Sequence, residues 1–205
     1  MKTELQQGLE AMQIDASDEQ QNKLLKFIDL LDKWNKAYNL TAIRNKHDML
    51  FLHILDSLSL LPHLAGSRRI LDVGSGAGLP GIPLAILEPD RVFVLLDSNG
   101  KKTRFIKQAI IELKLKNVTV VHDRIEKYSP EENFDCITTR AFATISETID
   151  MIEHFLLKEA RILFMKSNTT DDELAKIESD YNKNVITLNV PGIDAPRTLA
   201  ILTKQ

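Results

Sequence analysis

Residues 69–83 read RILDVGSGAGLPGIP, and this stretch decides which fold the rest of the chain can adopt. A short, mostly apolar segment at residues 70–73 leads into a loop, and four of the chain's eight glycines lie between positions 74 and 81. Glycine tolerates positive φ and has no Cβ, so such a loop can pass close to a ligand. The prolines suit the first turn of a helix that follows. With a second apolar run at residues 92–97, the order strand, glycine loop, helix, strand predicts half of a nucleotide-binding α/β sheet.

Two patterns overlap in this loop. Residues 76–81 match the dinucleotide pattern G-x-G-x-x-G, and Asp97 follows at the place of a ribose-binding acid. Asp72, however, is a carboxylate two residues before the first glycine, where it would be unfavourable beside a pyrophosphate. It suits a ligand with a cationic amino-acid end, because opposite charges attract strongly in a partly dry cleft. The residues therefore favour a ligand other than NAD, and an NAD-dependent oxidoreductase stays an alternative.

Counted from Asp72, the glycine pattern becomes D-x-G-x-G-x-G and resembles motif I of the class I S-adenosylmethionine-dependent methyltransferases. The resemblance implies that Asp72 lies near the methionine amino group of the cofactor and that Gly74, Gly76 and Gly78 face it. It also implies that Asp97 binds the ribose hydroxyls. The expected cofactor is S-adenosyl-L-methionine, which leaves S-adenosyl-L-homocysteine as its product.

The composition is that of an ordinary globular chain, with 205 residues, 43% hydrophobic and 27% charged. The single cysteine, Cys136, excludes an internal disulfide framework and fits a reducing compartment. No apolar run is long enough to span a bilayer, so we expect a cytoplasmic protein without a membrane partner. A net charge of −3 means that any RNA-binding surface must be local. We expect a monomer with a helical subdomain at 1–65 and a cofactor-binding domain at 66–205.

The N-terminal part is predicted to be helical. Ser17 and Gln20 form a candidate capping box for a long helix, on which Trp34 and Tyr38 are interpreted as core residues. Residues 38–43 are interpreted as a connector without chemistry of its own, and residues 47–64 as a further helical segment.

Alternating strands and helices follow the second strand. The predicted strands cover residues 118–121, 134–138, 161–165, 185–190 and 198–202, and the predicted helices cover residues 101–115, 145–157 and 170–181. The fold class is therefore α/β, a doubly wound, mostly parallel seven-stranded sheet of the class I methyltransferase type. An N-terminal helical extension precedes the sheet, and the last two strands close it as a hairpin-like pair.

Several further blocks resemble one family, the bacterial RsmG (GidB) ribosomal RNA methyltransferases. The blocks are YNLT at 38–41, HxxDSL at 53–58, the run at 72–83, LDSNGKK at 96–102, RIE at 124–126 and TRA at 139–141. They occur in the family's order and cover nearly the whole chain. The resemblance implies that the protein methylates N7 of one guanine in a loop of 16S ribosomal RNA, within the small ribosomal subunit or its precursor.

The same resemblance implies roles for individual residues. It places Gly74 and Leu79 at the cofactor loop, Ser98 beside Asp97 at the ribose, Ile125 and Glu126 near the adenine, and Arg140 at the boundary of cofactor and substrate. One departure follows the fifth strand, where the family usually has Lys-Gly and this chain has Lys166-Ser167-Asn168.

The chemistry of N7 fits the residues present. Guanine N7 has an unprotonated lone pair, so no general base is required and rate must come from holding the reactants aligned. Arg140 is the candidate catalytic residue, because its donor fork can bind a phosphate or the O6 edge beside N7. An ion pair with Asp135 or Glu126 is the alternative for Arg140. Phe142 is a candidate for stacking on an extruded base, or a core residue.

Other candidates concern the RNA, metals and competing functions. For His53 and Asp56, a capping or core hydrogen-bonding role is favoured over a catalytic pair. Candidate RNA-binding residues are Lys101, Lys102, Arg104, Lys166 and Arg197; the basic turn at 101–104 either faces phosphate or is only solvated. No metal is expected, because no cluster of histidine, cysteine and aspartate residues has the spacing of metal ligands. A small-molecule methyltransferase and a non-catalytic ribosome-docking module remain further alternatives.

Overall fold

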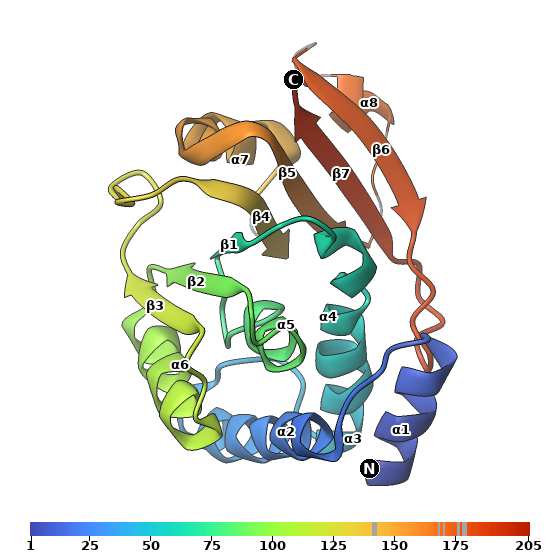
Figure 1. The fold of residues 1–205 in the computed structure, drawn as a ribbon. Helices are drawn as coiled ribbons and strands as arrows, with labels where there is room; N and C mark the ends of the chain where they lie inside the picture. The colour runs from blue at the N-terminus through green and yellow to red at the C-terminus, as the bar shows by residue number, and fades with distance from the viewer. Residues whose placement is uncertain (141–142, 168, 170, 176, 178–179) are drawn as a thin grey trace.

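The computed structural model describes residues 1–140, 143–167, 169, 171–175, 177 and 180–205. Its centre is a seven-stranded sheet in the order β3-β2-β1-β4-β5-β7-β6 (Figure 1). The strands are β1 (Arg69–Val73), β2 (Val92–Asp97), β3 (Val118–His122), β4 (Phe134–Arg140), β5 (Leu156–Lys166), β6 (Tyr181–Thr187) and β7 (Thr198–Lys204). Among the strands described, β7 runs antiparallel to both neighbours, and the other pairs are parallel. The predicted sheet and its closing pair are confirmed.

Helices cover both faces of this sheet. Successive side chains of a buried strand point to opposite sides, so both faces present apolar residues that must be covered. Ile70 of β1 packs with the helices of the first half of the chain, whereas Leu71 packs on the opposite face with α7 (Ile145–Ile152). The first layer contains α1 (Lys2–Ala11), α2 (Asp18–Tyr38), α5 (Gly81–Leu87) and α6 (Gly100–Leu113), as Figure 1 shows. No helix of the described residues is long and apolar enough to cross a membrane.

The long helix α2 begins as predicted. The Ser17 hydroxyl accepts a hydrogen bond from the Gln20 amide, and the Gln20 side chain accepts one from the Ser17 amide, which completes the capping box. Trp34 is partly buried and its ring lies 5.8 Å from that of Phe105 on α6. Tyr38 stacks on Trp34 but is 37% exposed, so its assignment to the core was wrong. It lies in the last turn of α2, where the helix ends in the left-handed Asn39.

The segment predicted as one helix over residues 47–64 is instead four short pieces. They are α3 (Lys46–Met49), the π-helix η1 (Leu50–Leu55), α4 (Asp56–Leu58) and the 3₁₀ turn η2 (Leu61–Leu64). A hydrophobic pattern does not distinguish the three kinds of helical turn, which differ only in their hydrogen-bond spacing. Such π-helical turns occur frequently at functional sites. This one carries His53.

Two further predicted helices are shorter than expected. The helix at 145–157 ends in α7 and a 3₁₀ turn (Glu153–Phe155), because Leu156 already pairs with Phe134 as the first residue of β5. Of the helix expected at 170–181, the described residues include α8 (Asp171–Ala175), and Tyr181 already begins β6. Pairing with β7 draws residues 181–184 into the sheet, which their polar sequence does not indicate.

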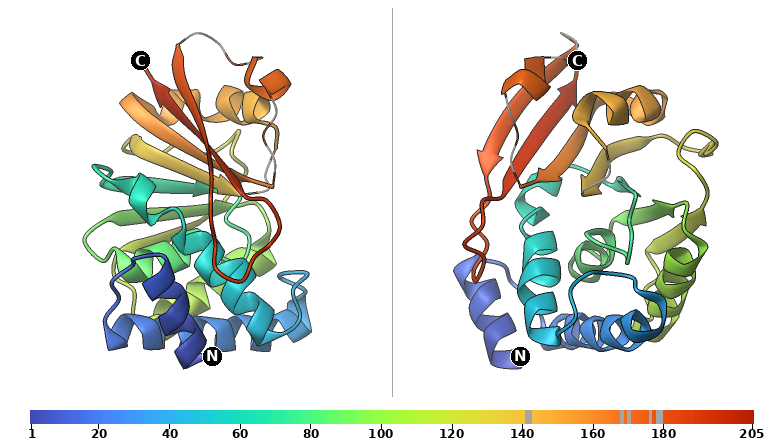
Figure 2. Two further views of the ribbon diagram at one scale, coloured as in Figure 1. Left: turned by 90° about the vertical axis from the view of Figure 1, so that its right-hand side faces the viewer. Right: turned by 180° about the vertical axis from the view of Figure 1, so that it is seen from behind.

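The connection between β6 and β7, residues 188–197, reaches down to the N-terminal helices (Figure 1 and Figure 2). Leu188 and Val190 are buried in the same cluster as the N-terminal helices. Gly192 in this connection has a φ of +75° and lies directly against the ring of Phe51 from η1. The connection therefore ties the end of the sheet to the N-terminal segment.

Replacing Gly192 by alanine should destabilise the protein. The new Cβ would lie 2.4 Å from Cδ1 of Phe51 and would hold a left-handed backbone, so we expect a loss of about 2–4 kcal/mol in the free energy of unfolding. Gly66→Ala is the matched control, since Gly66 has a similar φ of +82° with nothing within 4 Å, and should lose only about 1 kcal/mol. Thermal or urea unfolding measures both, and equal losses would contradict the packing of residues 188–197 on η1.

Candidate cofactor and substrate site

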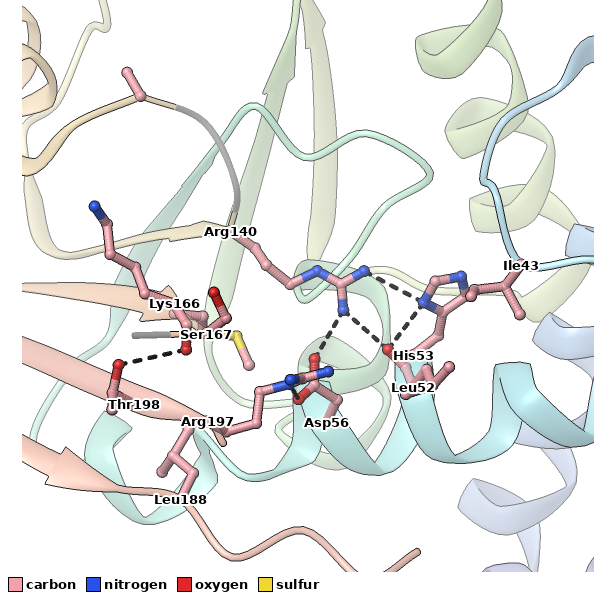
Figure 3. Close-up of a pocket in the computed structure, with 12 residues that line it drawn as sticks. Ile43, Leu52, His53, Asp56, Arg140, Lys166, Ser167, Leu188, Arg197 and Thr198 are labelled. Atoms are coloured by element: carbon pink, nitrogen blue, oxygen red, sulfur yellow. Dashed lines mark hydrogen bonds and ion pairs between the residues drawn. The ribbon is translucent and has the colours of Figure 1, made fainter. Parts of the chain in front are cut away.

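Two pockets lie where the predicted site residues gather. The first, which we call the loop pocket, has a volume of about 450 Å³ and follows β1, β2 and β3. Its lining comprises Val73, Gly74, Leu96, Asp97, Ser98, Asn99, Lys102, Asp123, Arg124, Ile125 and Glu126. The second, the arginine pocket, has a volume of about 560 Å³ and is lined by residues from Ile43 to Thr198, including His53, Asp56, Arg140, Lys166 and Arg197 (Figure 3). Ligands of doubly wound sheets bind beyond the carboxyl ends of the strands, where both pockets lie.

Asp97, at the end of β2, is held in place by the backbone around it. Its Oδ2 accepts a hydrogen bond from the Gly76 amide at 2.8 Å, and its Oδ1 accepts one from the Asn99 amide at 2.7 Å. The Asn99 side chain in turn caps α6 by accepting from the amides of Lys101 and Lys102. One carboxylate therefore joins the glycine loop to the start of α6 and fixes the shape of the loop pocket.

Asp72, in β1, is a buried carboxylate with one oxygen satisfied. Its Oδ2 accepts a hydrogen bond from the Gly81 amide at 2.9 Å, while its Oδ1 has no hydrogen-bond partner among the described residues. A Cβ on residue 81 would lie 2.8 Å from this carboxylate, so only glycine allows the contact. Burial raises the pKa of Asp72 to about 7, against the opposing effects of the Gly81 amide, the Arg140 guanidinium and the neighbouring Thr138 hydroxyl. Asp97 raises this pKa further.

Arg140, at the end of β4, is held by the N-terminal segment. Its Nη1 donates to the Leu52 carbonyl at 3.2 Å and to Asp56 Oδ2 at 3.1 Å, and its Nη2 lies 3.3 Å from His53 Nδ1 (Figure 3). Burial lowers the pKa of Arg140, and Asp56 and then Asp72 counteract this effect, so the guanidinium stays charged at neutral pH.

The alternative partners predicted for Arg140 were wrong. Asp135 accepts hydrogen bonds from the amides of Arg68 and Arg69, and Glu126 lines the loop pocket. The acid that pairs with Arg140 is Asp56, which lies 84 residues earlier in the chain. A side chain so distant in sequence could not be selected from charge spacing alone.

His53 is neutral in this pocket. Burial and the neighbouring Arg140 lower its pKa to about 4, although the Leu52 carbonyl acts in the opposite direction. Its Nε2 lies 2.8 Å from Thr41 Oγ1, and its Nδ1 faces the Arg140 guanidinium. The Leu52 carbonyl, 3.0 Å from Nδ1, requires a proton on that nitrogen, whereas the Arg140 guanidinium, which can only donate, requires its lone pair.

Thr41 was missed in the sequence analysis. The connector at 38–43, interpreted as free of chemistry, orients His53 through this hydroxyl, and the Asn35 side chain orients the connector by bonding Thr41 N and Ile43 O. The hydrogen-bonding role predicted for His53 and Asp56 is confirmed, but their partner is Arg140. The signal for Thr41 that the sequence offered was the Asn39-Leu40-Thr41 block, which precedes His53-x-x-Asp56 in the chain.

The remaining predicted residues divide between the pockets. Gly74, Asp97, Ser98, Ile125, Glu126 and Lys102 line the loop pocket, and Arg140, Lys166 and Arg197 line the arginine pocket. Lys166 pairs with Glu173, and Arg197 Nε donates to Asp56 Oδ1 at 3.1 Å. Asp72, Gly76, Gly78 and Leu79 line neither pocket, and Lys101 and Arg104 are exposed on α6. Phe142 lies outside the described residues.

Two solved methyltransferase structures share this fold. An O-methyltransferase, TomG from Streptomyces achromogenes, in complex with SAM, has a TM-score of 0.60 at 15% identity, over 88% of this chain and 90% of that one. A putative O-methyltransferase from Klebsiella pneumoniae has a TM-score of 0.64 at 14% identity, over 96% and 94%. The fold is therefore that of the class I methyltransferases.

Sequence comparison identifies the family within that class. The family model described as rRNA small subunit methyltransferase G, GidB, matches residues 20–200. Proteins named ribosomal RNA small subunit methyltransferase G are 47% identical in Idiomarina loihiensis, over 100% of both chains, and 50% identical in Shewanella amazonensis, over 94% of this chain and 93% of that one. This chain belongs to the GidB family.

Proposed function

We propose that this protein transfers a methyl group from S-adenosyl-L-methionine to N7 of a guanine in a loop of 16S ribosomal RNA. The observation that carries the proposal is the place of Asp72 in β1, between β2, which ends in Asp97 of the loop pocket, and β4, which ends in Arg140 of the arginine pocket. The pKa of Asp72 responds to Asp97 of the loop pocket and to Arg140 of the arginine pocket. A cofactor that occupies the loop pocket with its cationic end at Asp72 would thus reach toward the arginine pocket.

The residues present fit this cofactor. The unpartnered Oδ1 of buried Asp72 suits an ammonium group, because an unsatisfied buried carboxylate is costly without a partner. Asp97 and Ser98 suit ribose hydroxyls, and Ile125 and Glu126 suit the adenine. Gly74, Gly76, Gly78 and Leu79 form the loop beneath the cofactor, and S-adenosyl-L-homocysteine would be left after transfer.

The arginine pocket is suited to hold the base without removing a proton. When bound, S-adenosylmethionine supplies a methyl group already activated on sulfur, and N7 supplies a free lone pair. Arg140 has its Nη1 donors occupied, while its Nε has no hydrogen bond to any described residue. This Nε–H group can donate a hydrogen bond to O6 of guanine or to a phosphate. Rate would then come from alignment rather than from acid–base catalysis.

The RNA is expected to cross the surface around both pockets. Lys101, Lys102 and Arg104 at the start of α6 and Lys166 and Arg197 at the arginine pocket are the proposed contacts. Backbone contacts of this kind provide affinity and position the RNA without reading its sequence. We propose that the small ribosomal subunit or its precursor is the substrate and that the protein acts as a cytoplasmic monomer.

The test is transfer of labelled methyl to small subunits from a strain that lacks the gene. We expect label at one guanine, where reduction and aniline treatment cleave the RNA chain because N7 is methylated. Label at another base atom would contradict the N7 assignment, and the absence of label would favour a docking module or a small-molecule methyltransferase. Calorimetry with S-adenosylhomocysteine and with NADH separates the methyltransferase from an oxidoreductase.

Removing two charges from the start of α6 should weaken RNA binding. We choose Lys101→Ala with Arg104→Ala because both side chains are exposed, whereas Lys102 lines the loop pocket. Each lost phosphate contact should reduce the slope of log affinity against log salt by about 0.7–0.9. Lys107→Ala with Lys116→Ala removes the same charge further along the chain and serves as control. Equal slopes for both double variants would show that residues 101–104 are only solvated.

A further inference from the structure

Asp56 is a buried carboxylate for which the proposed chemistry has no role. Its side chain is only 5% exposed, and both of its oxygens are bound by arginines from distant parts of the chain. Oδ2 accepts from Arg140 at the end of β4, and Oδ1 accepts from Arg197 just before β7 (Figure 3). Asp56 itself begins α4 in the N-terminal segment. Three segments that are remote in sequence therefore meet at one carboxylate.

The two guanidinium groups need this carboxylate between them. Arg197 lowers the pKa of Arg140, which is the expected effect of two like charges brought close together, and Asp56 raises it. The side chains of Arg140 and Arg197 are 23% and 21% exposed, so water screens their repulsion poorly. His53, whose Nδ1 lies 3.3 Å from Arg140 Nη2, is neutral and cannot replace the anion.

We propose that Asp56 is a positioning residue that holds Arg140 and Arg197 next to each other for the RNA substrate. It does not touch the reacting atoms. By accepting from Nη1 of Arg140 and Nε of Arg197, it fixes where the two guanidinium groups lie in the lining of the arginine pocket. This inference rests on the proposed function, and it adds that the N-terminal segment supplies the anion that orders the substrate side of the site.

The test compares single-turnover methylation of small subunits at saturating cofactor by the wild type, Asp56→Asn and Asp135→Asn. Asp135 is the matched control, since it is a carboxylate whose hydrogen bonds within the described residues go to the amides of Arg68 and Arg69, and it lines neither pocket. We expect Asp56→Asn to lose at least about 30-fold in rate while its Kd for S-adenosylhomocysteine stays within about twofold. Asp135→Asn should keep the wild-type rate per folded molecule.

A double-mutant cycle with Arg197→Gln distinguishes positioning from a general loss of structure. If Asp56 acts by holding Arg197, then Arg197→Gln should cost much less in the Asp56→Asn background than in the wild type. Independent, multiplying effects would overturn the proposal. A rate for Asp56→Asn within about twofold of wild type, or a fall in cofactor affinity that matches the fall in rate, would overturn it too.

If Asp56→Asn does not fold, Asp56→Glu decides the question. It keeps the charge but moves the carboxylate by one methylene, so a loss of about threefold or more in rate with unchanged cofactor Kd supports the proposal. A smaller loss overturns it. Failure of the proposed function is distinguishable, because the wild type itself would then transfer no methyl group to the subunits.

Discussion

Arg140→Ala is expected to reduce methyl transfer by at least about 100-fold, the usual effect of removing a donor aligned with the reacting group. The variant should fold, because the side chain lies at the rim of the sheet. Its loss leaves one oxygen of Asp56 unpaired, but the other oxygen still binds Arg197. Single-turnover methylation of small subunits measures the rate. Calorimetry with S-adenosylhomocysteine measures the cofactor affinity separately.

Two further variants sharpen the Arg140 prediction. Arg140→Lys keeps the charge but loses the planar fork, so it should recover only a small part of the rate. Arg68→Ala removes an exposed arginine and should have no effect on the rate. Near-normal turnover of Arg140→Ala would refute the role given to this residue. A fall in cofactor affinity as large as the fall in rate would assign Arg140 to cofactor binding alone.

The loop pocket could be predicted from the sequence because its parts are local. The stretch from Asp72 to Gly81 and the turn after Asp97 each carry their residues within one strand-to-helix connection. The parallel order of the strands then brings these connections to the same edge of the sheet. Gly74 and Asp97 line the pocket as the pattern predicts, whereas Asp72, Gly76, Gly78 and Leu79 of the same motif line neither pocket.

The arginine pocket could not be predicted in the same way. Its central ion pairs join Asp56 to Arg140 and Arg197, which are 84 and 141 positions away. Several acids stand closer to Arg140 in the sequence, and charge spacing gives no reason to prefer Asp56. The π-helical geometry of η1, which presents His53 and the Leu52 carbonyl to the same guanidinium, is also invisible to hydrophobic periodicity.

The same contrast explains the errors in the fold. Residues 156 and 157 were assigned to the end of a helix, and residues 158–160 to no element. In the structure Glu159 has a φ of +63°, and β5 continues through it because Leu156 pairs with β4. Tertiary pairing thus overrides local preference at a bulge, as it does at the start of β6.

Binding of the cofactor should depend on pH through Asp72. The pKa of this buried carboxyl is raised to about 7, so in the free protein it is largely protonated near pH 6 and largely ionised near pH 8. A ligand with an ammonium group binds the ionised form, which lowers the pKa of Asp72 and releases a proton. Affinity for S-adenosylhomocysteine should therefore rise about tenfold from pH 6 to pH 8.

Calorimetry at several pH values, in buffers of different ionisation enthalpy, measures both this affinity and the released proton. Adenosine is the matched control, because it lacks the amino-acid end and should bind with an affinity independent of pH over this range. Asp72→Asn should bind S-adenosylhomocysteine at least about tenfold more weakly at pH 8 and lose the pH dependence, since the amide carries no charge. If adenosine showed the same rise, or if Asp72→Asn kept it, the titrating group would lie elsewhere and the orientation proposed for the cofactor would be wrong.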